Sequence, residues 1–491
     1  MKKLITTIIV FAFLANVSAQ IEINSSGQVG IGTSSPLYKL HVMGDTYVAG
    51  NILLGNTFNF WGTTSDIPIA FKVNNVYAGF TGYASSANVS FGYGALNSLS
   101  GANNTAIGYR ALYSNTTGVY NIATGADALT NNTTGWRNIA VGAGALYSNE
   151  TGEENIATGT NALYLNKTGG VNIAIGTNAL YSNTKGRVNI AIGNIALYSN
   201  TEGNENIAIG TNALGSNTTG GRNTAIGIHA LANNNKTESE YNTATGYSAL
   251  VSNTIGHHNT ATGAGALNYN TTGSYNTAIG VGTFFWNTTG SFNTAIGFET
   301  GVSAGELTNA TAIGYGALVT ASNQVRIGNG SVTSIGGYAN WSNFSDGRAK
   351  KNIKADVPGL NFINLLQPVT YNLDLDAMDN LLGIDKAKKN KDEKDMPKEL
   401  KDKNEKAKKT KEEQVETGFV AQDVEKVAKK IGYNFSGVNV DESGIYSLSY
   451  AEFVVPLVKA VQELSTKNDQ LQKQVDELTG LVNKLLEKQT K

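Results

Sequence analysis

A repeat with a period of 17 residues constrains this chain more than any other feature. Between residues 88 and 320 the unit reads Asn-Thr/Ile-Ala-Ile/Thr-Gly, two variable residues, Ala-Leu, and then Ser/Asn-Asn-Thr-Thr-Gly. A fixed period this short indicates stacked coils, each contacting only its neighbours. The first glycine of the unit marks 14 copies, and two extra residues precede Gly246: Gly92, Gly108, Gly125, Gly142, Gly159, Gly176, Gly193, Gly210, Gly227, Gly246, Gly263, Gly280, Gly297 and Gly314.

The unit fits a coil of a β-solenoid. Seventeen residues are too few for a helix-turn-helix repeat, while Thr/Ile-Ala-Ile/Thr alternates as a short strand does. Glycine allows a corner with positive φ, and Asn-Thr-Thr-Gly is typical of turns. Inward Ala and Leu would form a thin core, and stacked Asn residues can form side-chain ladders. We therefore predict a mainly β chain with a solenoid over residues 88–320, and we expect several chains to associate laterally because one coil buries little apolar surface.

The Asn-x-Ala-x-Gly pattern resembles the head repeats of trimeric autotransporter adhesins, although the period of 17 is longer than theirs. The resemblance implies a trimeric β-roll. Sequons such as Asn115-Thr116-Thr117 are expected to be turn residues of the repeat rather than glycosylation acceptors. Some tyrosines recur in phase, and packing between coils or chains is a better explanation for them than a sticky stripe for a ligand: Tyr113, Tyr147, Tyr181 and Tyr198.

Charge divides the chain into two parts. Residues 20–344 contain 23 charged residues in 325, whereas residues 345–491 contain 50 in 147. The boundary lies near Ser345. Up to that boundary we expect an N-terminal β-rich region over 20–87, the solenoid over 88–320 and connecting strands over 321–344.

The first residues are typical of an export signal. Lys2 and Lys3 precede the apolar stretch Leu4–Leu14, and Val17-Ser18-Ala19 has the small residues that signal peptidase recognises, so we expect residues 1–19 to be removed after Ala19. Eleven apolar residues are too few to span a bilayer, and no later stretch is long enough. The chain is predicted to be secreted or held at the cell surface, with no transmembrane segment.

Four blocks near the C-terminus carry the most specific motif. They are Ser345-Asp346-Gly347-Arg348-Ala349-Lys350, Leu366-Gln367-Pro368-Val369-Thr370-Tyr371, Thr417-Gly418-Phe419-Val420-Ala421-Gln422-Asp423-Val424 and Leu448-Ser449-Tyr450. In this order they resemble the peptidase S74 domain, the intramolecular chaperone at the C-terminus of phage endosialidases and tail fibres. The resemblance implies a small α+β chaperone module over residues 345–453 and a self-cleavage dyad formed by Ser345 and Lys350.

The chemistry of such a dyad can be stated independently. A serine hydroxyl is a weak nucleophile and needs a base. A lysine can act as that base when it is enclosed and neutral, in a variant of the serine triad. Lys350 must therefore be enclosed, which we expect only when neighbouring chains have assembled. Asp346 and Arg348 are expected to pair and to shape the turn.

Residues 385–416 form a charged insertion in this module. They contain 12 lysines and 10 acidic residues in 32 positions, with no aromatic residue. This composition predicts a solvated segment that is disordered or a lone helix. The near balance of charge excludes a nucleic-acid partner for this segment, and the net charge of −1 argues against a nucleic-acid-binding chain in general.

Residues 454–491 carry an unbroken heptad pattern that predicts a coiled coil. Position a is Val454, Val461, Asn468, Val475 and Val482, and position d is Leu457, Leu464, Leu471, Leu478 and Leu485. Val at a, Leu at d and a buried Asn favour two strands, but both resemblances imply three. We expect three strands, because positions e and g carry few charges and broaden the seam: Ser465, Gln472, Gln474, Thr479 and Leu481.

Two functions remain open. The first is an exported homotrimeric fibre, adhesin-like, whose chaperone module directs assembly and then cuts itself off. The alternative is a structural surface or matrix fibre that keeps the module as a cap. A glycan or cell-surface ligand rests on the resemblances alone. An enzyme acting on an external glycan is disfavoured, since the repeat lacks convergent acids. No cofactor or metal site is expected, since the chain has no Cys and only four His: His41, His229, His257 and His258.

Overall fold

The computed structural model describes residues 21–23, 25–31, 40–42, 70–73, 76–81, 86–97, 101–236, 238–336, 338, 342–382, 398–441 and 444–489. The predicted signal peptide lies outside these residues. The chain divides into two units, residues 1–64 and 65–491. In the first unit β1 (Ile21–Ile23) pairs antiparallel with β2 (Val29–Ile31), and β2 pairs parallel with β3 (Leu40–Val42).

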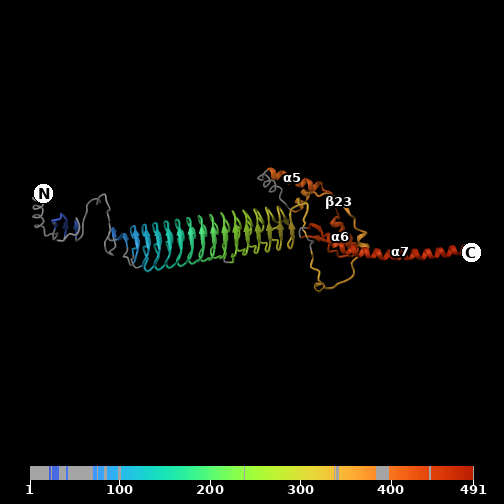
Figure 1. Cartoon of the computed structure of the whole chain (residues 1–491), viewed down its shortest axis with the longest axis horizontal. Coiled ribbons are helices and arrows are strands. Elements are labelled where there is room, and N and C mark those ends of the chain that lie inside the picture. The colour runs from blue at the N-terminus through green and yellow to red at the C-terminus, as the bar shows by residue number, and fades with distance from the viewer. Residues whose placement is uncertain are drawn as a thin grey trace. The chain divides into compact units, whose positions relative to one another are not determined.

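The second unit contains the predicted β-solenoid, which Figure 1 shows as a row of stacked coils. Two antiparallel strands, β4 (Ala70–Val73) and β5 (Val76–Thr81), pair with each other, and β5 pairs with the first coil strand. From there the strands are parallel and pair in sequence order: β6 (Val89–Phe91), β7 (Thr105–Ile107), β8 (Ile122–Thr124), β9 (Ile139–Val141), β10 (Ile156–Thr158), β11 (Ile173–Ile175), β12 (Ile190–Ile192), β13 (Ile207–Ile209), β14 (Thr224–Ile226), β15 (Thr243–Thr245), β16 (Thr260–Thr262), β17 (Thr277–Ile279), β18 (Thr294–Ile296), β20 (Thr311–Ile313) and β22 (Val325–Ile327). The solenoid prediction is confirmed.

The register of the ladder follows the sequence period. Ala157 of β10 lies opposite Ala174 of β11, 17 residues on. Where the sequence has two extra residues, Thr224 of β14 pairs with Thr243 of β15, so the insertion leaves the register intact. A second, shorter pairing joins β19 (Gly301–Val302) to β21 (Leu318–Val319).

Glycine is required where each strand ends. The 14 marker glycines have φ between +108° and +140°, a region that other residues rarely adopt. A Cβ at Gly176 would also lie 2.5 Å from the carbonyl oxygen of Gly193 in the next coil. The recurring glycine therefore follows from both backbone conformation and the close approach of stacked coils.

The core of the solenoid is thin, as predicted, and closes within one chain. In the coil of β11, Ala174, Ala179 and Leu180 are fully buried, and the same three positions are buried in most other coils. Leu180 has φ of +51°, so the buried leucine sits in a left-handed turn, and its N–H donates to the carbonyl of Ala196 in the next coil. That bond belongs to a second line of backbone hydrogen bonds between coils.

Two buried columns of asparagine run through the coils. In the first, Asn172 Nδ2 donates to Asn155 Oδ1 (3.1 Å) and to the carbonyl of Gly186 (2.8 Å). In the second, Asn183 Nδ2 donates to Asn166 Oδ1 (2.8 Å). These side chains satisfy backbone groups at turns where the coils have no strand pairing. The expected asparagine ladders are therefore present, and the sequon asparagines of the second column, including Asn115, are buried turn residues.

Aromatic rings stack along the outside of the coils. The rings of Tyr147, Tyr164, Tyr181 and Tyr198 follow one another at 4.9, 5.3 and 5.2 Å between centroids, with interplanar angles of 12° or less. Burial, and then the neighbouring Tyr147 and Tyr181, raise the pKa of Tyr164. Each ring covers the face of the next. Tyr147, Tyr181 and Tyr198 therefore pack between coils, and neighbouring rings cover both faces of Tyr181, whereas Tyr113 lies outside this stack with Arg110 over its ring.

The C-terminal part alternates short helices and strands: η1 (Gly347–Ala349), α2 (Leu360–Ile363), β23 (Val369–Tyr371), α3 (Leu375–Leu381), α5 (Lys398–Glu413), β24 (Glu416–Gly418), α6 (Ala421–Lys430), β25 (Val438–Val440), β26 (Tyr446–Leu448), η2 (Tyr450–Phe453) and α7 (Val454–Gln489). Phe362, Val424, Ala428, Phe435 and Phe453 form its buried core. Glu463 of α7 accepts a hydrogen bond from Leu360 N at the start of α2 (2.8 Å), which ties the long helix to this core. None of the helices in the described part of the chain has the length and apolar character needed to cross a bilayer.

Candidate functional site

Ser345 and Lys350 lie together in the structure. Lys350 Nζ donates to Ser345 Oγ across 2.9 Å. The single turn η1 brings the two side chains together, because it folds the chain back between them. The separation is within the range that a base needs to take a hydroxyl proton.

Asp346 and Arg348 hold this turn. Asp346 Oδ1 accepts from the backbone N–H of Arg348 (2.9 Å), which caps η1, and the two side chains form an ion pair at 2.6 Å. The hydrogen bonds from the Arg348 side chain, and then from its backbone, lower the pKa of Asp346. Because the pKa of Asp346 is lower in the folded state, its ion pair with Arg348 stabilises the turn at pH values above the ordinary carboxyl pKa. This stabilisation is lost as the pH falls through the lowered pKa. The expected pairing of these residues is present.

The pair is open to solvent in the single chain. Ser345, Lys350 and the residues of η1 between them are exposed or only partly covered. A lysine that acts as a base needs an enclosed environment that favours its neutral form. The described chain therefore supplies the geometry of a Ser-Lys dyad but not the enclosure that the chemistry requires.

Three of the four sequence blocks, residues 366–371, 417–424 and 448–450, lie close together in the structure. Strand β23 pairs with β24, so that Thr370 lies opposite Thr417. At the end of β24 the backbone N–H of Phe419 donates to Tyr450 Oη (3.0 Å). Burial, followed by the nearby Tyr450, raises the pKa of Tyr371. The sequence blocks thus mark residues that pack against one another, and sequence reasoning did not assign this role to Tyr371 and Tyr450.

The described part of the charged insertion is helical. It forms α5, and Lys408 pairs with Asp376 of α3 at 2.6 Å. The Asp376 hydrogen bond raises the pKa of Lys408. Asn372 Nδ2 also donates to the carbonyls of Glu412 and Gln414 at the end of α5 (3.0 Å each). These contacts tie α5 to the module, whereas the sequence suggested a solvated segment without such attachments.

Helix α7 begins at Val454 and carries the predicted heptads on one continuous surface. Its Val and Leu residues at positions a and d are between 45% and 63% exposed. Only Pro456 and Ala460, near its start, are buried. The hydrophobic seam therefore has no covering within the described chain.

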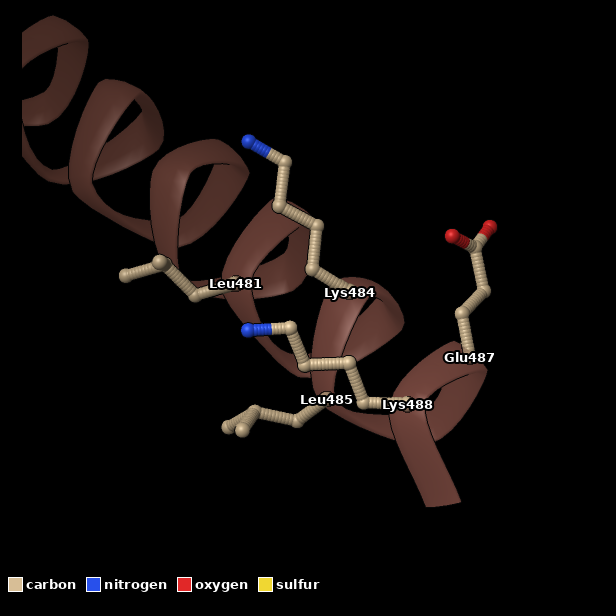
Figure 2. A pocket seen from close by; sticks show the side chains of 5 residues that line it. All are labelled: Leu481, Lys484, Leu485, Glu487 and Lys488. Atoms are coloured by element: carbon tan, nitrogen blue, oxygen red, sulfur yellow. The ribbon is translucent and has the colours of Figure 1, made fainter. Parts of the chain in front are cut away.

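The seam widens toward the end of α7. A shallow hollow there is lined by Leu481, Lys484, Leu485, Glu487 and Lys488, and Leu481 and Leu485 project from the same side of the helix (Figure 2). Leu481 occupies position g. Because all of the lining residues belong to one helix, the hollow is a groove between neighbouring side chains of α7 and not a binding pocket.

Among the described residues, no group of three or more His, Asp or Glu side chains is placed to hold a metal ion. No curated protein and no solved structure matches the chain. One family model does match, and the match begins at the serine of the Ser345-Lys350 pair. Residues 345–433, 89 of the 491 residues, match the peptidase S74 family, described as the chaperone of endosialidase.

Proposed function

We propose that this protein is an exported homotrimeric fibre, adhesin-like, and that residues 345–491 act as an intramolecular chaperone for its assembly. In this proposal Ser345 then cuts the chain, with Lys350 as its base. The cut would separate the solenoid from the charged C-terminal part. The family match and the unpaired heptad seam of α7 support the assembly role.

The observation that carries the cleavage is the 2.9 Å hydrogen bond from Lys350 Nζ to Ser345 Oγ. It lies at the first residue of the family match. The bond arises within six residues held by the Asp346 cap and therefore does not depend on distant packing. A nucleophile and its base in hydrogen-bond reach, with the turn fixed by a third group, is the arrangement that covalent catalysis uses.

The reaction is written as an intramolecular acyl transfer. Neutral Lys350 takes the hydroxyl proton while Ser345 Oγ attacks the carbonyl carbon of an adjacent peptide bond. The C–N bond breaks, and the leaving amine takes the proton from Lys350. Water then hydrolyses the ester to a carboxylate and the free serine. Since nucleophile and scissile bond share one chain, proximity replaces substrate binding and no cleft for an external substrate is needed.

The alternative is a fibre that keeps its C-terminal module as a cap. The exposure of Lys350 in the single chain favours it, because a lysine base in a Ser-Lys dyad needs to be enclosed. The two functions differ in whether assembly encloses the pair. A glycan or other cell-surface ligand is compatible with both and rests on the resemblance to adhesins and tail fibres.

Mass spectrometry of the purified assembled protein tests the cleavage. The wild type is expected to give fragments of about 325 and 147 residues once the signal is removed. Ser345→Ala and Lys350→Ala should each leave a full-length chain that is still trimeric, because one removes the nucleophile and the other removes the base.

Two neighbours provide matched controls. Ser342→Ala and Lys351→Ala remove exposed residues of the same types and should cut as the wild type does. Uncut wild-type chain in assembled protein would exclude the peptidase role and leave the cap function. Cutting in Ser345→Ala would show that another nucleophile, or a contaminating protease, is responsible.

A further inference from the structure

The outward face of the solenoid strands has an unusual composition. Each of the 15 parallel strands turns its first and third residues outward around a middle residue that is mostly buried. All 30 outward residues of this strand face are Ile, Val, Thr or Phe, and none is charged. The strands lie one behind another along the stack (Figure 1). The face is therefore an uncharged surface along the whole solenoid, and all of its outward residues except Phe91 are β-branched.

The strand face is large for an exposed apolar surface. Ile107, Ile175 and Ile279 are between 40% and 43% exposed, and Val325 is 66% exposed. A standard stable interface buries roughly 800 Å² on each partner, and the strand face extends over 15 successive strands. Continuous apolar patches of this size on soluble proteins mark interaction sites.

The strand face carries no charge in any of its 15 strands. The same coils carry charged residues on other rows, where they pair from coil to coil. Arg137 pairs with Glu154 at 3.2 Å, and Lys185 pairs with Glu202 at 2.7 Å. Charge is therefore available to the repeat but is absent from the strand face in every coil, as expected for a surface that is buried in the working form.

We propose that the strand face is where copies of this chain meet, side by side and in parallel, along the full length of the solenoid. The inference rests on the homotrimer proposed above and adds the surface that joins the chains. A partner that covers this face must itself be apolar with the same coil spacing, and another copy of the chain satisfies both conditions. The exposed a and d residues of α7 are a separate reason to expect association, because parallel α7 helices from other copies of the chain would bury them in a coiled coil.

Other occupants fit less well. A polysaccharide would need convergent polar groups, and the strand face offers only threonine hydroxyls. In coils such as that of β12, both outward residues are isoleucine, Ile190 and Ile192. Symmetric packing places the same residue of each copy near a common axis, so a given outward residue should approach its own counterparts.

Cysteine crosslinking tests the surface directly, because the full-length chain contains no cysteine. Ile175→Cys places one thiol on the strand face. Leu165→Cys is the matched control, since Leu165 is similarly exposed (37% against 40%) but lies on a different row of the coils. Leu471→Cys, at position d of α7, reports assembly through the coiled coil.

Each purified variant is treated with a short bismaleimide, and crosslinked dimer is measured on a denaturing gel. Ile175→Cys and Leu471→Cys should crosslink, roughly tenfold more than Leu165→Cys, because only the first two thiols lie close to a symmetry axis. Crosslinking at Leu471→Cys without Ile175→Cys would overturn the strand-face proposal and leave the trimer standing. Crosslinking at neither would overturn both, and equal crosslinking at Leu165→Cys would overturn the assignment of this face.

Discussion

Asparagine has a structural role in this solenoid that hydrophobic residues usually take in a core. Two asparagines in nearly every coil are fully buried. Asn172 accepts from Asn189 N in the next coil (3.0 Å) while its own Nδ2 donates to Gly186 O (2.8 Å). A buried polar side chain is tolerated only when its hydrogen bonds are satisfied. Stacking one asparagine on another meets this condition because each supplies the partner of the next.

Replacement of one ladder asparagine is expected to destabilise the chain. Asn172→Leu leaves Asn189 N without its acceptor and removes one of the two donors to Gly186 O, and a buried unpaired group costs on the order of 1–3 kcal/mol. Asn194→Leu is the control, since Asn194 is exposed in a neighbouring coil. Thermal unfolding followed by circular dichroism should show a lower Tm for Asn172→Leu only. Equal Tm values for the two variants would contradict a stabilising role for the ladder.

The sequence predicted some residue conformations but not others. The marker glycines and turn asparagines were predictable, because positive φ and turn hydrogen bonds favour those residue types. Left-handed backbone also occurs at Val171, Val188 and Leu180. Propensity disfavours it for β-branched residues, so only stacking against neighbouring coils accounts for it. The Ser345–Lys350 contact was predicted from a resemblance, while the exposure of the pair required the structure.

At the scale of elements, the solenoid strands and helix α7 share an exposed apolar surface. Each is amphipathic, and each leaves an apolar surface uncovered in the described chain. For α7 the sequence predicted both the helix and its seam, because the 3-4 spacing of Val and Leu has one simple interpretation. For the strands the alternation of residues predicted that the small alanine points inward, and the structure confirms it, whereas the extent to which the outward residues stay exposed required the structure.

Substitution in the seam of α7 should reduce assembly. The double variant Leu464→Asn/Leu471→Asn removes two leucines per chain from the predicted coiled-coil core, at a cost of about 2–5 kcal/mol for each buried leucine. Light scattering should report a smaller particle than for the wild type. The control Thr466→Asn/Lys473→Asn places the same residues at position f, on the far side of the helix, and should keep the wild-type mass. An unchanged mass for the seam variant would assign assembly to the solenoid.

At the scale of the whole molecule, the solenoid is a sum of nearly identical contacts between neighbours. Its stability should therefore depend on the number of coils and on each interface between coils. The register is kept where the sequence adds two residues before β15, which shows that the turns accept a length change while the strands remain paired. We therefore expect that whole coils can be added to or removed from the solenoid without changing the contacts between the remaining coils.

Removal of one whole coil should leave the fold intact. Deletion of residues 173–189 joins Asn172 to Ile190 and restores the repeat at the junction. We expect strand content by circular dichroism and resistance to limited proteolysis close to those of the parent, because every remaining contact is one that the solenoid already makes. Deletion of residues 173–181 shifts the register by half a coil and should create a protease-sensitive site. Equal resistance in both deletions would contradict the coil as the unit of folding.

The reversed strand at the start of the solenoid has a consequence for how long such an object can become. A row of identical coils could continue without limit, because each coil exposes the same strand edge as the coil on which it stacks. Strand β5 is six residues long and runs opposite to β6, and its other edge pairs with the antiparallel β4, so the parallel pairing of the coils does not continue beyond β6. The antiparallel strand therefore ends the series of parallel coils on this side of the solenoid. The length of the solenoid is then inherited through the number of copies of the repeat in the gene, and not set by how many molecules add to one another.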